Sequence, residues 1–171
     1  MFVEDLSFFF FFFSLCYSTL ALWIVWALKN KNGGPGNKLL LPFVLFKIIC
    51  AYAFVLIHIY VYRGGDTFLY FAGSKLIANF ILTNPEHTLS YLFDPIQEMQ
   101  TFPYSKELPL LKTFRSNITL FQCRITSLFT ILSFGNFATA TVLVSLFSAS
   151  GIWLMYRSFC SLYPALYTHF S

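Results

Sequence analysis

The sequence predicts an all-α, polytopic membrane protein with about three transmembrane helices and a long external loop that holds interfacial helices. Apolar residues make up 57% of the 171-residue chain and charged residues 11%, whereas soluble domains carry about 25% charged residues. Three predominantly apolar segments, residues 6–28, 39–62 and 137–156, are each long enough for a helix across the hydrocarbon core. These observations exclude an ordinary soluble domain.

The charge argues against nucleic-acid binding, and the spacing of the cysteines argues against a zinc site. The net charge is only +4, and lysines and arginines form no basic stripe, so no nucleic-acid partner is expected. The cysteines are scattered singly, without a CxxC pair or a histidine at zinc-ligand spacing. We therefore expect neither a metal nor a cofactor. The four cysteines are Cys16, Cys50, Cys123 and Cys160.

The first apolar segment, residues 6–28, is predicted to cross the membrane toward the cytoplasm. It follows Glu4 and Asp5, whereas a secretory signal peptide begins with basic residues and is shorter. The turn after it, residues 29–38, contains three lysines. Because short loops rich in lysine stay on the cytoplasmic side, the N-terminus is expected outside.

The second segment, residues 39–62, is predicted to run outward. Pro42 falls in its first turn, where a missing N–H is tolerated. Lys47 is two turns in, from where its side chain can reach back to the cytoplasmic surface. His58 is close to the outer end and is interpreted as an interfacial residue.

Residues 63–136 are predicted to form the external loop. Polar residues recur every three to five positions in residues 67–82, which predicts a helix lying in the interface. Residues 117–134 are almost long enough to span, but Arg124 falls in the middle, at a cost of about 2.5–3.5 kcal/mol. We therefore predict a second interfacial helix there, and a third crossing over residues 137–156.

Residues 137–156 have a face of small residues, which suits close contact with another helix. Arg157 then falls on the cytoplasmic side, as the orientation requires. Few residues follow. We expect either a homo-oligomer or, preferably, the N-terminal part of a larger helical bundle.

The chemistry-bearing residues cluster where the second crossing ends, in the segment from Arg63 to Asp66. A carboxylate just outside a membrane helix can accept a proton from a hydroxyl, and an adjacent arginine can hold a phosphate. Gly64 and Gly65 allow a sharp turn. The alternative is structural: Asp66 is the N-cap of the helix over residues 67–82.

The elements follow one another as an outward helix, an acidic residue, an external loop with interfacial helices and a small-residue inward helix. This order resembles that of the GT-C membrane glycosyltransferases. The resemblance covers residues 61–164, and residues 134–164 look like an early helix of the dolichyl-phosphate-mannose-type and lipid A-modifying members. It implies transfer of a sugar from a polyprenyl-phosphate donor to an acceptor on the outer face of a membrane, expected to be the bacterial inner membrane.

The resemblance also implies roles for particular residues. Asp66 corresponds to the acid that deprotonates or orients the acceptor. Arg63, Lys112, Arg115 and Arg124 are candidates for binding the carrier phosphate, with Arg124 best placed because a cation in an apolar helix needs a partner. For Lys112 and Arg115, attraction to anionic headgroups is the simpler interpretation.

The chain also departs from the family. It lacks the paired acid of some members and has an extra helix before the one that precedes Asp66. Of the other external groups, Glu86, His87 and Asp94 lack the spacing of a metal site and are interpreted as solvated. A second hypothesis therefore stands beside the enzyme: a non-catalytic membrane subunit or scaffold, with membrane lipids around it, whose external loop binds a partner.

Overall fold

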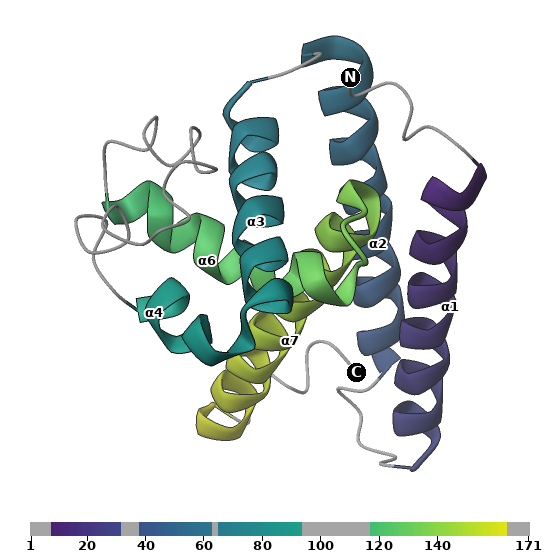
Figure 1. The fold of residues 1–171 in the computed structure, drawn as a ribbon. Helices are drawn as coiled ribbons and strands as arrows, with labels where there is room; N and C mark the ends of the chain where they lie inside the picture. The colour runs from purple at the N-terminus through teal and green to yellow at the C-terminus, as the bar shows by residue number, and fades with distance from the viewer. Residues whose placement is uncertain (1–7, 32–37, 63–64, 94–116, 164–171) are drawn as a thin grey trace. The chain divides into compact units, whose positions relative to one another are not determined.

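The computed structural model describes residues 8–31, 38–62, 65–93 and 117–163, and these residues are helical without a β-strand among them (Figure 1). The all-α prediction is confirmed for this part of the chain. The elements are α1 (Phe8–Lys31), α2 (Leu40–Ile57), the π-helical turn η2 (His58–Tyr62), α3 (Asp66–Thr83), the 3-10 turn η3 (Pro85–His87), α4 (Thr88–Phe93), α6 (Asn117–Leu132) and α7 (Phe137–Leu162).

The helices differ from the predicted segments mainly at their ends. The α7 helix continues past residue 156 to Leu162, because no breaker precedes Pro164, whose ring disfavours helix in the residue before it. The α6 helix ends at Leu132, two residues before the predicted end. Helices are present at both predicted interfacial segments, while their position in an interface stays a prediction.

Two helical stretches, Leu40–Tyr62 and Phe137–Leu162, are long and apolar enough to cross a membrane. A third, the apolar stretch Phe11–Ala27 within α1, is shorter. By length and composition these stretches weakly favour a membrane location, and the number of crossings remains a prediction.

The chain divides into two compact units, residues 1–56 with 141–171, and residues 57–140. The first unit contains α1 and most of α2 and α7. Its helices contact one another through hydroxyls: Ser14 Oγ donates to Tyr52 Oη at 2.8 Å, and Ser145 Oγ donates to the carbonyl of Lys47 at 3.1 Å. Hydrogen bonds of this kind hold helices together where no water competes.

In the first unit, some polar side chains are buried and large apolar side chains are exposed, which is the reverse of a soluble protein. Ser14 and Ser18 of α1 are buried, whereas Trp23, Phe46 and Phe147 are each more than 60% exposed. In water the hydrophobic effect would favour the reverse arrangement. The distribution is typical of helices that face hydrocarbon.

The second unit is built on the contact between α3 and α6, which cross in Figure 1. Tyr91 of α4 completes its core and stacks on Phe80 of α3, with ring centroids 5.6 Å apart. Gly73 and Ser74 of α3 are buried, and small residues of this kind let helix backbones approach closely. The core cluster consists of Ile77, Phe80, Tyr91, Leu120 and Cys123.

A tight turn joins α6 to α7. The Gly135 N–H donates to Thr130 O at 2.9 Å and the Phe134 N–H donates to Ile131 O at 3.1 Å, the two bonds of a Schellman motif. The φ angles of Phe134 and Gly135 are 53° and 74°. Both residues are therefore in the left-handed region, which explains why α6 stops at Leu132.

Candidate functional site

Two unusual backbone conformations precede Asp66. The turn η2, His58–Tyr62, is π-helical, a form that often occurs at functional sites. The His58 and Tyr62 rings lie against each other in it, with centroids 5.3 Å apart. Gly65 then has φ 98° and ψ −175°, a conformation that is essentially restricted to glycine. This glycine lets α3 begin at the next residue.

Asp66 is the first residue of α3, and it is exposed. The N-cap is Gly65, and no side-chain hydrogen bond caps the helix. The structural alternative, in which Asp66 is the N-cap, therefore does not hold, because the N-cap is Gly65, one residue earlier. The carboxylate stands in the first turn, where it interacts favourably with the positive end of the helix dipole.

Arg124 is half-buried in the middle of α6, beside the fully buried Cys123. The Cys123 thiol donates to the carbonyl of Tyr70 at 3.6 Å. Tyr70 follows Asp66 by one helical turn, about 6 Å along the axis of α3. The helix that carries Arg124 thus contacts α3 one turn from Asp66, within the same unit. The other predicted phosphate ligands, Arg63, Lys112 and Arg115, lie outside the described residues.

Cys123 serves the contact between α3 and α6 rather than chemistry. Burial raises the pKa of its thiol from 9.0 to about 11, so almost none of it is thiolate at neutral pH. Since the thiolate is the nucleophile and the metal ligand, this cysteine is chemically inert in the folded protein.

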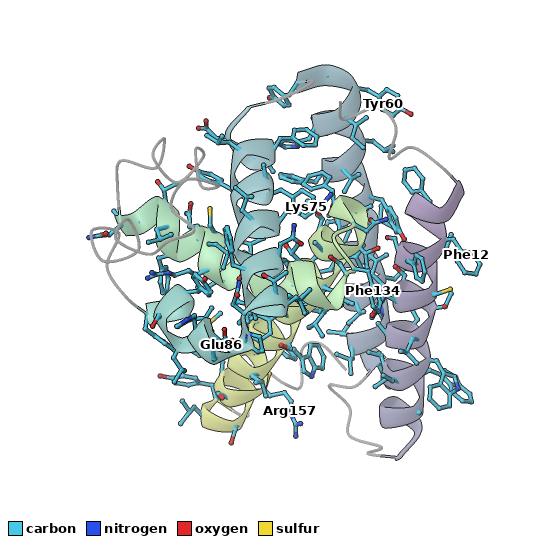
Figure 2. All side chains as sticks on the ribbon, in the orientation of Figure 1. Phe12, Tyr60, Lys75, Glu86, Phe134 and Arg157 are labelled. Atoms are coloured by element: carbon cyan, nitrogen blue, oxygen red, sulfur yellow. The ribbon has the colours of Figure 1, made fainter. Side chains whose placement is uncertain are left out.

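Sequence reasoning missed Lys75 as a site residue. Lys75 is half-buried in the middle of α3, and its Nζ lies 5.6 Å from the centroid of the Phe71 ring. A Cβ added to Gly135 would come within 3.1 Å of Lys75 Cε, so the lysine packs against the α6–α7 turn. Figure 2 labels Lys75 on α3 and Phe134 in that turn. A single lysine inside an apolar helix was the available signal.

Within the described ranges, no group of three or more histidine, cysteine or acidic residues is placed to hold a metal ion. Glu86 is exposed in η3 and labelled in Figure 2, and His87 packs its ring against Tyr91 with centroids 6.5 Å apart. Asp94 lies outside the described residues.

Comparison of the chain with protein-family models, with curated proteins and with solved structures finds no match. Function is therefore inferred from the residues and their geometry.

Proposed function

We propose that this chain is a membrane-embedded glycosyltransferase, or a part of one, that moves a sugar from a polyprenyl-phosphate donor to a hydroxyl acceptor on the outer face of the membrane. The observation that carries the proposal is the placement of Asp66. Its carboxylate is exposed at the start of α3, and Gly65 rather than Asp66 caps that helix. The carboxylate is thus available for chemistry.

The surroundings of Asp66 suit a donor that is both lipid and phosphate. The preceding turn exposes Tyr60, Val61 and Tyr62, and tyrosines favour the boundary between lipid and water. Arg124 lies on the helix that crosses α3 one turn away. A guanidinium there can neutralise a phosphate diester by paired hydrogen bonds.

The proposed reaction is a substitution at the anomeric carbon of the donor sugar. The acceptor oxygen forms a bond to that carbon while the bond between the carbon and the phosphate oxygen breaks. Asp66 takes the proton of the acceptor hydroxyl, and the polyprenyl phosphate leaves with the bonding electron pair. Arg124 stabilises the charge that develops on the leaving phosphate.

The test compares two isosteric substitutions in the full protein in native membranes. With a radiolabelled polyprenyl-phosphate hexose as the donor, Asp66→Asn should lower sugar transfer by about 10²–10⁴-fold, the usual effect of removing a general base. Glu86→Gln is the matched control, because it also neutralises an exposed acid of the same unit and should leave the rate unchanged.

Normal transfer by the Asp66→Asn protein contradicts the catalytic role. The complete absence of transfer in the unaltered protein, with the chain correctly inserted, favours the alternative, a non-catalytic subunit or scaffold.

A further inference from the structure

We propose that Lys75 and the α6–α7 turn form a binding site for the phosphate group of a lipid. This site is distinct from Asp66 and does not require the transfer reaction. Lys75 lies nine residues after Asp66, about 14 Å along the axis of α3. A failure of the proposed function would therefore not count against this site, and a failure of this site would not count against the proposed function.

The position of the ammonium group is set by two structural elements. Phe71, one turn earlier on α3, lies under Nζ at 5.6 Å, within the range of a cation–π contact. Gly135 lies against the end of the side chain, where an added Cβ would be 3.1 Å from Cε and 3.9 Å from Nζ. Lys75 thus differs from a lysine that merely extends along a helix to reach water.

No carboxylate of the described residues balances this charge. The acidic residues among them are Asp66 and Glu86, both exposed, at the start of α3 and beyond its end. The structure shows no ion pair of Lys75 with either. A half-buried cation in an apolar setting is costly without a counter-charge, so an anion from outside the described chain suits this place.

The other side of the turn adds a second attraction for an anion. Helix α7 begins at Phe137, two residues after Gly135, so its positive end faces the turn. In its first turn the Thr139 side chain is fully buried, and Oγ1 has no hydrogen-bond partner. The Thr139 N–H donates to Asn136 Oδ1 at 3.0 Å, so the attraction of this helix end for an anion is that of its dipole.

The surface next to the site identifies the anion as one attached to a lipid. Phe134 and Leu132 are 78% and 56% exposed, which is unfavourable in water and suits acyl or prenyl chains. Phosphate is the usual anionic group of membrane lipids. Both a phospholipid headgroup and a polyprenyl phosphate supply it.

The experiment measures lipid binding by the full chain in phosphatidylcholine nanodiscs. One series contains added polyprenyl monophosphate and the other contains added phosphatidylglycerol. Lys75→Met keeps the length of the side chain and its packing against Gly135 but removes the charge. Lys47→Met is the matched control, because Lys47 is also a half-buried lysine in an apolar helix.

We expect Lys75→Met to weaken binding of at least one phosphate lipid by tenfold or more, and Lys47→Met to leave it within twofold. Loss in only one series identifies the source of the phosphate, and loss in both indicates a general phosphate site. Equal losses in the two variants would indicate non-specific attraction and overturn the proposal, as would unchanged binding by Lys75→Met. If Lys75→Met fails to fold, Lys75→Gln replaces it: the amide is polar but uncharged, and binding as tight as that of the unaltered protein would overturn the site.

Discussion

Gly135→Ala tests the turn between α6 and α7, on which both the end of α6 and the position of Lys75 depend. Gly135 has φ 74°, and an L-residue in the left-handed region costs about 1–2 kcal/mol. The added methyl would also lie 3.1 Å from Lys75 Cε, closer than the optimum of roughly 3.5–4.0 Å between carbons. Since Cε is near the end of a flexible side chain, the backbone term dominates. We expect the free energy of unfolding to fall by about 1–2 kcal/mol.

Substitutions at two other glycines distinguish the cost of backbone strain from the cost of a steric contact. Gly151 lies in α7 with open space around its Cβ direction, so Gly151→Ala should be neutral or stabilising by up to about 1 kcal/mol. Gly65 also has open space, but its φ is 98°, so Gly65→Ala should cost about 1–3 kcal/mol from the backbone alone.

The assay is unfolding of the purified protein in mixed micelles of a mild detergent and dodecyl sulfate, with helix content measured by circular dichroism. Adding Lys75→Ala to Gly135→Ala should recover only a few tenths of the loss, because most of it is backbone strain. If Gly135→Ala unfolds at the same dodecyl sulfate fraction as Gly151→Ala, Gly135 is not in the left-handed region and the turn is wrong.

Three further predictions concern other parts of the molecule. Tyr52→Phe removes the acceptor of the Ser14 hydroxyl and should lower the free energy of unfolding by about 0.6 kcal/mol, the average for hydrogen bonds between membrane helices; an unchanged unfolding midpoint would argue against this bond. Burial raises the pKa of the Cys123 thiol to about 11, above the pKa of the same thiol in the unfolded chain. Because the folded thiol has the higher pKa, its contribution to the free energy of unfolding should be constant below pH 9 and decrease as the pH rises from 9.0 toward 11. A profile that matches that of Cys123→Ala throughout this range would contradict the burial of the thiol. An impermeant maleimide should reach Asn32→Cys only from the cytoplasmic side, and labelling from outside would reverse the predicted orientation.

The helical class and the approximate extent of the helices could be read from the chain because the signals are local. Long apolar runs and polar spacing within residues 67–82 depend only on near neighbours. The helices that the structure contains accordingly begin and end within a few residues of most predicted positions. Asp66 was also found from local context, since it follows two glycines at the end of an apolar segment.

Details of the candidate site depended on contacts between residues far apart in the chain. The approach of α6 to the first turns of α3 rests on the contact of Cys123 with Tyr70, which no local pattern specifies. The left-handed conformation of Phe134 could not be expected from its residue type, because aromatic residues disfavour positive φ. Lys75 acquires its setting only when Gly135 packs against it. Hydropathy and residue spacing predict which segments become helices. Which helix faces contact each other is decided by side-chain shape and by hydrogen bonds between residues that are brought together in the folded unit.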